Sequence, residues 1–292
     1  MSSLTPHQRG LLLTVIGVLV LTPDALMVRL VEVDYWTALF WRSLFAALVL
    51  FALNAVIEKE NPIEAVFGLF RNGMLCALFF AGSNVCFVIS ITHTTVANTL
   101  VILASMPFIA AVLTIVLMRK NLALRTWMTI VLAMVGIVMV FWGRFGDGGA
   151  FGDVMAILCA LFMAATLVLI SANPRINSTA AIGLGAFLAA LFAFFMGAEP
   201  TAVTNRDLIV LVANGGVIIP VAMGLITYGP KLISAPEVSL IMLLETVLGP
   251  LWVWLVLNEQ PPTQTFVGGS LVIGAIVVNA WLSFRTRQTQ RT

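Results

Sequence analysis

The fold of this chain is decided by two stretches that can be laid over one another, NTLVILASMPFIAAVLTIVLMRK (98–120) and VSLIMLLETVLGPLWVWLVLNEQ (238–260). Leu100 falls over Leu240, and each stretch is followed by an apolar segment that contains glycine. Many membrane transporters consist of two copies of one helical bundle. The overlay therefore predicts two tandem repeats.

The composition is that of a multi-pass membrane protein. Hydrophobic residues make up 61% of the 292 residues and charged residues only 10%. A helix needs about 20 apolar residues to cross a hydrocarbon core about 30 Å thick. Ten stretches reach that length, which predicts an all-α membrane protein with ten transmembrane helices at 9–30, 36–56, 66–91, 95–118, 123–142, 152–172, 179–198, 207–228, 235–257 and 264–284.

Five spans per half is an odd number, so the second copy must enter the membrane in the opposite sense to the first. We predict a first five-helix repeat over 9–142 and a second, inverted repeat over 152–284. Inverted repeats place a substrate site at their interface, near the middle of the membrane. The connections are too short for a soluble catalytic domain, and the first apolar run is predicted to be a helix rather than a cleaved signal peptide.

The distribution of lysine and arginine predicts the orientation, because these residues accumulate on cytoplasmic loops. With the N-terminus inside, only Arg29, Arg144 and Arg206 lie outside. Eleven basic residues then lie on the cytoplasmic side: Arg9, Lys59, Arg71, Arg119, Lys120, Arg125, Arg175, Lys231, Arg285, Arg287 and Arg291. We therefore expect both termini in the cytoplasm.

Two opposite charges lie deep in consecutive predicted spans. Arg42 is six residues from the outer end of its span, and a central arginine costs about 2.5 to 3.5 kcal/mol to insert. Asp24 is six residues from the outer end of the preceding span, so both lie roughly 9 Å below the boundary at 1.5 Å per residue. An Asp24–Arg42 ion pair is expected. It either locks the two spans together or takes part in transport. In the second case Arg42 holds a substrate carboxylate in one state and Asp24 in another, or Asp24 meets a substrate amine.

Glu245 lies near the centre of the ninth predicted span. Desolvation there favours the protonated carboxyl, which suits it to carry a proton or to contact substrate. The alternative is a hydrogen bond that joins two helices. Glu237 differs, because Ser234-Ala-Pro-Glu237 has the pattern of a capping box and predicts a structural role.

Other residues are candidates for the cavity or for its movement. Trp252 and Trp254 point about 200° apart, so at most one of them faces the cavity. Prolines inside predicted helices are expected to kink them and to act in gating: Pro23, Pro107, Pro220 and Pro250. Polar residues away from the span ends either line the cavity or join helices by hydrogen bonds: Asn84, Asn98, Ser105, Asn214 and Thr246.

The sequence lacks the motifs of metal sites, of hydrolytic enzymes and of nucleic-acid-binding proteins. Cys76, Cys86 and Cys159 lie inside spans without a CxxC or Cys/His spacing, so no metal site is predicted. No HExxH or GxSxG is present, so no catalytic residue and no enzyme activity are predicted. The chain lacks a basic domain for nucleic acid. We expect a small-molecule substrate and membrane lipids as partners, no cofactor beyond a coupling proton, and a monomer.

Four motifs resemble those of the drug/metabolite transporter superfamily, and within it the ten-helix EamA-type proteins. They are ALFWRSLFAAL (38–48), ITHTTVANTLVILASMPF (91–108), FGDVMAILCAL (151–161) and LLETVLGPLWVWLVLNEQPPTQTFVGGSLVIGA (243–275). The resemblance runs from about Gly10 to Phe284. The chain departs from the pattern where Arg119 and Lys120 replace the Asn258-Glu259 pair of the second repeat, and where Val247 matches Pro107.

The resemblance implies a secondary transporter in a bacterial-type inner (plasma) membrane that exports small metabolites by alternating access. The architecture is similar to that of the YddG-type exporters of aromatic amino acids, so amino acids or related zwitterions are the expected substrates. Two alternatives stay open. One is a passive facilitator or exchanger, and the other is a flippase for lipid carriers.

Overall fold

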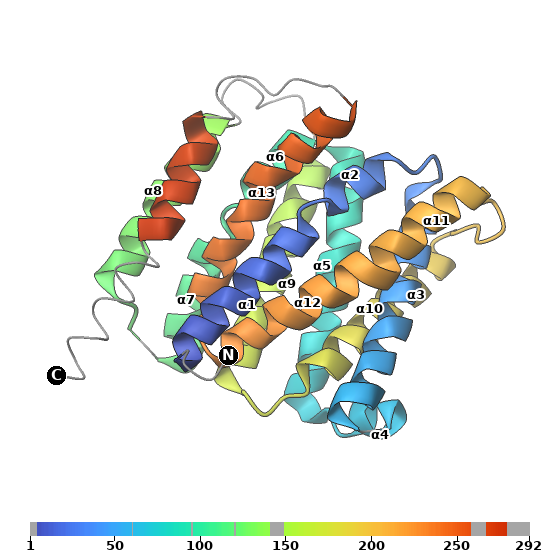
Figure 1. Cartoon of the computed structure of the whole chain (residues 1–292), viewed down its shortest axis with the longest axis horizontal. Coiled ribbons are helices and arrows are strands. Elements are labelled where there is room, and N and C mark those ends of the chain that lie inside the picture. Colours follow the sequence, from blue (N-terminus) through green and yellow to red (C-terminus); the bar gives the residue numbers. More distant parts are fainter. Residues whose placement is uncertain are drawn as a thin grey trace.

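The computed structural model describes residues 5–59, 61–94, 96–119, 121–140, 149–257 and 267–278, and all regular structure within them is helical (Figure 1). Besides the helix Val267–Val278, the elements are α1 (Pro6–Leu21), α2 (Asp24–Arg29), α3 (Tyr35–Leu53), η1 (Asn54–Glu58), α4 (Pro62–Phe67), α5 (Phe70–His93), α6 (Val96–Leu103), α7 (Met106–Met118), α8 (Leu124–Val140), α9 (Ala150–Ala172), α10 (Ser178–Phe195), α11 (Asn205–Ala213), η2 (Asn214–Ile218), α12 (Ile219–Tyr228), η3 (Gly229–Lys231) and α13 (Ala235–Leu257).

The described helices confirm an all-helical protein that crosses the membrane several times. Seven stretches within the described residues are long and apolar enough to span a bilayer: Pro6–Val28, Tyr35–Val56, Arg71–His93, Ala150–Ala172, Ser178–Phe195, Asn205–Lys231 and Ala235–Val256. Three shorter apolar helices, Met106–Met118, Thr126–Met139 and Val267–Val278, fall on the fourth, fifth and tenth predicted spans. The count of ten spans and the side of the termini stay predictions.

Two prolines end a helix instead of bending it, which corrects the prediction of continuous kinked spans. The first span stops at Leu21 and restarts at Asp24, with Pro23 between. The fourth stops at Leu103, and α7 restarts with Pro107 in its first turn. Proline has no N–H to donate, so it is tolerated at a helix start and not in its interior.

The other two prolines lie differently. Pro220 is in the first turn of α12, directly after the π-helical segment η2. Pro250 lies within α13, which continues past it to Leu257, and its side chain is outside the described part of the structure. A hinge at either position stays a prediction.

The helices of the two halves interleave. In Figure 1, α1 from the start of the chain lies beside α12 and α13 from its end. Further contacts join α5 to α9, α3 to α10 and α7 to α13. In the order of spans, α5 of the first half corresponds to η2 and α12 of the second, and α9 and α10 correspond to α1 and α3. The contact of α5 with α9 therefore corresponds to that of α12 with α1. The contact of α5 with α10 corresponds to that of α3 with η2 and α12. The packing thus has the internal symmetry of two repeats.

Small residues let these helices approach closely. Ala46 and Ala47 of α3 and Ala189 and Ala193 of α10 are almost fully buried. A helix face of alanines brings two backbones together, which is how membrane helices gain contact without a hydrophobic driving force. The α3–α10 contact therefore packs closely and holds the helix that carries Arg42.

Candidate functional site

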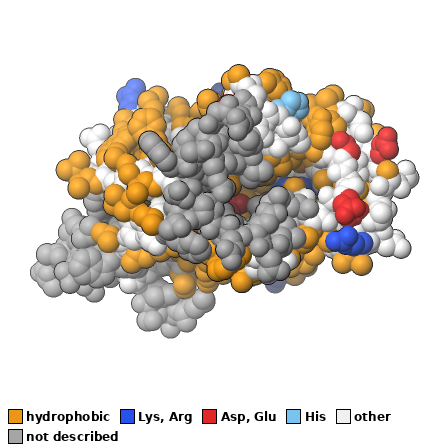
Figure 2. Space-filling view, turned by 90° about the horizontal axis from the view of Figure 1, so that it is seen from above, with side chains coloured by type: hydrophobic (Ala, Val, Ile, Leu, Met, Phe, Trp, Pro, Cys, Tyr) orange, Lys and Arg blue, Asp and Glu red, His pale blue; other side chains and the backbone are white. Residues whose placement is uncertain are grey.

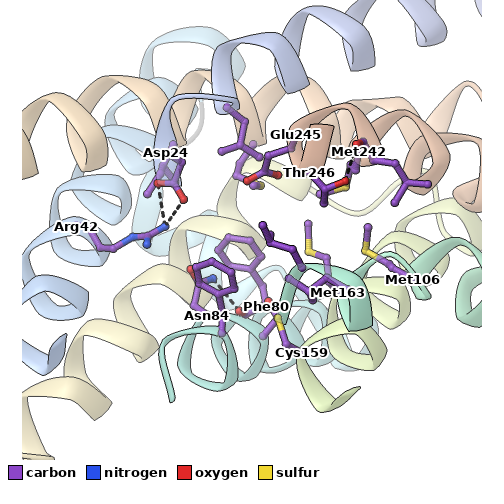
Figure 3. Close-up of a pocket in the computed structure, with 18 residues that line it drawn as sticks. Asp24, Arg42, Phe80, Asn84, Met106, Cys159, Met163, Met242, Glu245 and Thr246 are labelled. Atoms are coloured by element: carbon purple, nitrogen blue, oxygen red, sulfur yellow. Dashed lines mark hydrogen bonds and ion pairs between the residues drawn. The ribbon is translucent and has the colours of Figure 1, made fainter. Parts of the chain in front are cut away.

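A cavity of about 130 Å³ lies between the two halves. The first half contributes side chains from α1, α2, α3, α5, α6 and α7, and the second half from α9, α12 and α13. Figure 3 shows the labelled side chains converging on this space from all sides. The lining is mixed, with charged groups at one end and apolar groups at the other.

The ion pair predicted from depth is present. Arg42 Nη2 lies 3.2 Å from both Oδ1 and Oδ2 of Asp24, and both residues are 5% exposed (Figure 3). The helix break at Pro23 makes Asp24 the first residue of α2. Asp34 caps α3 by accepting hydrogen bonds from the backbone N–H groups of Trp36 and Thr37, and it thereby fixes the helix that carries Arg42.

The Arg42 side chain keeps one donor unused. Its Nε is buried and has no hydrogen-bond partner among the described residues. The segment η2 packs directly against the Arg42 backbone. The approach is so close that a Cβ on Gly215 would collide with the Arg42 carbonyl oxygen. Asn214, next to that glycine, also has a buried Oδ1 without a partner among the described residues. Leaving such a group unpaired costs about 1 to 3 kcal/mol.

Glu245 faces the same cavity from α13 (Figure 3). In the described part of the chain no hydrogen bond or ion pair is made by its carboxyl group. Thr246 beside it donates to the carbonyl oxygen of Leu243 at 2.8 Å, and Asn84 Nδ2 donates to that of Phe80 at 2.9 Å. Asn84 therefore keeps its own side-chain oxygen for a ligand.

The charged end holds two carboxyl groups and one guanidinium. Asp24 is matched by Arg42, and no other counter-charge among the described residues lies within hydrogen-bonding distance of Glu245. An unpaired carboxylate in an apolar site is costly unless it takes up a proton or meets a cation. The site can therefore hold a proton, an ammonium group or both in turn.

Comparison with known proteins agrees with this architecture. The model of the EamA-like transporter family matches residues 8–142 and again 150–281. The chain belongs to the EamA-like transporter family. One solved structure, described only as the crystal structure of a protein, superposes with a TM-score of 0.81 over 94% of this chain and 98% of its own, at 13% identity. No curated protein matches the chain in sequence.

In this EamA-like transporter the predicted site residues divide into two groups. Asp24, Arg42, Asn84, Glu245 and Thr246 line the cavity. Of the others, Ser105 lies in the break between α6 and α7 and donates to the carbonyl oxygen of Ile102 at 2.6 Å. Asn98 lies on α6, but its side chain is outside the described part.

Trp252 does not line the cavity. It is 40% exposed, and its Nε1 donates to Thr22 Oγ1 at 2.8 Å. Thr22 lies in the break between α1 and α2, next to Pro23. Trp252 therefore ties α13 to the segment that presents Asp24 instead of contacting a ligand directly.

Most of the apolar lining was not predicted from the sequence. The cavity lining includes Phe80, Cys159 and four methionines, none of which is a predicted site residue. One signal was available, since Phe80 and Met242 lie four and three residues before the polar residues Asn84 and Glu245. Residues three or four apart share a helix face.

Polar side chains join the two halves at the starts of α13 and α9. Ser234 N and Oγ both donate to Glu237 Oε2, at 3.0 and 2.8 Å, as the capping-box pattern predicts. Glu237 Oε1 also lies 3.3 Å from His7 Nε2, which joins α13 to α1. At the start of α9, Thr94 Oγ1 donates to Asp153 Oδ1 at 2.7 Å. Thr94 overlays Ser234 in the alignment of the repeats, but Ser234 contacts a residue of its own helix start whereas Thr94 contacts the other half.

The described part of the structure contains no candidate metal site. Among the described residues no group of three or more histidine, cysteine, aspartate and glutamate side chains is placed to hold an ion. The membership of a transporter family and the form of the cavity point to binding and movement of a solute rather than to an enzyme reaction.

Proposed function

We propose that this EamA-like transporter exports small zwitterions, amino acids and aromatic ones among them, across the plasma membrane of a bacterial cell by alternating access. The observation that carries the proposal is the cavity between the two repeats, with two carboxyl groups and one guanidinium at one end and apolar side chains at the other. A zwitterion with an apolar side chain has the complementary charges and shape.

Arg42 would hold the substrate carboxylate. Its unused Nε–H and its Nη groups form the planar donor set that carboxylates accept from arginine. The substrate carboxylate replaces Asp24 as the partner of Arg42, and Asp24 then meets the substrate ammonium. The ion pair is broken and remade in each cycle.

Glu245 would couple transport to protons. Its carboxyl group has no hydrogen-bond or ion-pair partner among the described residues, so it can take up a proton while Asp24 holds the substrate ammonium. A proton that enters from outside and displaces the substrate would drive export against a gradient. The inverted topology of the second repeat supplies the two equivalent conformations that such an exchange needs.

The access side is proposed from the orientation. Figure 2 views the molecule from above the upper edge of Figure 1, and acidic side-chain atoms are visible near the middle of that face. In the predicted topology this is the outer face, because the connection between α2 and α3 lies there (Figure 1). We infer an outward-open resting state.

The test is uptake of labelled amino acids, led by Phe, Trp, Thr and Met, into proteoliposomes with and without an imposed pH gradient. Flux that the gradient accelerates in the parent but not in Glu245→Gln would support proton coupling through Glu245. Glu32→Gln is the matched control, because Glu32 is an exposed carboxylate whose side chain is 82% accessible. It should behave as the parent.

Two other results would change the assignment. Equal flux in the parent and in Glu245→Gln, with or without the gradient, would indicate a facilitator. No flux of any amino acid would contradict the proposed substrate class and move the search to other metabolites or to lipid carriers.

A further inference from the structure

The apolar part of the cavity lining contains four methionines beside four leucines, an isoleucine, two phenylalanines and a cysteine. Met106, Met163, Met223 and Met242 come from four different helices and are each 6–8% exposed. Methionine supplies four of the 18 lining residues, against 13 of the 292 residues in the chain. The sulfur is therefore concentrated at this cavity rather than spread evenly through the protein.

The thioethers lie opposite the charges. In Figure 3, Met106, Met163 and Met242 are on the side of the cavity away from Arg42 and Asp24. A zwitterion held by its charged groups at Asp24 and Arg42 would therefore point its side chain at the methionines. This step rests on the proposed function.

Methionine makes a different wall from leucine or isoleucine. Its side chain is unbranched, has three rotatable bonds and fills irregular gaps, and its sulfur makes favourable contacts with aromatic rings. In a rigid apolar pocket one methylene changes the specificity constant by about 10- to 200-fold. A wall that changes shape with its ligand discriminates less, as at other methionine-rich binding surfaces.

We propose that Met106, Met163, Met223 and Met242 form a conformable wall that makes the transporter accept a series of zwitterions with apolar side chains of different length and shape. The charged end selects the zwitterion, and the thioether wall sets the breadth of the series. The cavity of about 130 Å³ is then one of several shapes that the same residues can adopt.

The experiment is competition for transport by a graded series, norvaline, norleucine, methionine and phenylalanine, in proteoliposomes. For the parent protein, the specificity constants of the four amino acids should differ by less than about tenfold, below the range of a rigid pocket. In Met163→Ile and Met242→Ile the β-branched side chain is stiff at χ1. These variants should still transport one or two amino acids of the series well and the others poorly. The range of specificity constants across the series should then exceed about thirtyfold.

The matched control is Met128→Ile on α8, where the methionine is 65% exposed and outside the cavity. Its range of specificity constants across the series should equal that of the parent. If an isoleucine variant does not fold, Met163→Leu and Met242→Leu conserve volume and give the same comparison with a smaller change.

The outcomes separate this inference from the function on which it rests. Transport of the series with an unchanged spread in the cavity variants would overturn the thioether wall and leave the proposed function intact. A parent that already discriminates more than about a hundredfold would do the same. A parent that transports no member would overturn both.

Discussion

At the scale of single residues, Asp24 and Arg42 make the strongest testable contact. Each is 5% exposed, and removing either partner leaves a buried charge unpaired. Asp24→Asn or Arg42→Gln alone should lower stability by about 3 to 5 kcal/mol. The double variant, which buries no unpaired charge, should recover most of that loss. Thermal unfolding of the purified protein in detergent measures all three.

The exposed pair Glu32 and Arg206, 3.9 Å apart, supplies the control, since its double neutralisation should leave the unfolding midpoint nearly unchanged. Transport separates the two roles left open for the buried pair. A folded Asp24→Asn, Arg42→Gln protein with normal transport would show that the pair only locks the helices. Loss of transport in that folded protein supports a role in binding.

At the scale of elements, the start of α9 meets the end of α5 at backbone distance. A Cβ on Gly152 would lie 2.7 Å from both the His93 carbonyl carbon and the Thr94 nitrogen. At the counterpart contact, a Cβ on Gly10 would lie 2.8 Å from Leu232 Cβ. Gly152→Ala must displace a backbone and should cost about 1 to 3 kcal/mol, whereas Gly10→Ala meets side chains and should cost less. Unfolding midpoints rank the two.

Gly224 is the matched position for both, because a Cβ there has nothing within 4 Å. Within α12, alanine is favoured over glycine by about 0.5 to 1 kcal/mol, so Gly224→Ala should stabilise slightly. A Gly152→Ala protein as stable as Gly224→Ala would mean that the two helices separate freely at this contact.

At the scale of the whole molecule, the outward-open assignment makes a prediction about sidedness. In a protein without its natural cysteines, Asn84→Cys places a thiol in the central cavity, and Asn173→Cys places one beside a separate hollow between α5 and the connection from α9 to α10. A membrane-impermeant thiol reagent added outside should label the first and not the second. Added inside, it should label only the second.

Substrate should slow the labelling of Asn84→Cys and leave that of Asn173→Cys unchanged. Labelling of Asn84→Cys from the inside alone would reverse the assigned state or the predicted orientation. Mapping the loops with a second tag distinguishes these two explanations.

The sequence predicts the helices better than it predicts their faces. Span length and composition locate the helical segments, and depth arithmetic finds the contact between Asp24 and Arg42 on consecutive spans of the first half. The methionines escape prediction because membrane helices are apolar on every side, so the pattern that reveals the inner face of a soluble helix is weak. The helix break beside Pro23 has a tertiary partner that the sequence does not reveal, since Trp252 hydrogen-bonds to Thr22.

The interleaving of the two halves has a consequence for biosynthesis. α3 and α5 find their partners α10 and α9 only in the second half of the chain. When the first half has left the ribosome and inserted, its contact faces are still covered by lipid alone. Final assembly must therefore wait until the last helices are inserted, and a chain that stops near residue 142 should be removed by membrane proteases. Co-expression of the two halves as separate polypeptides should protect both.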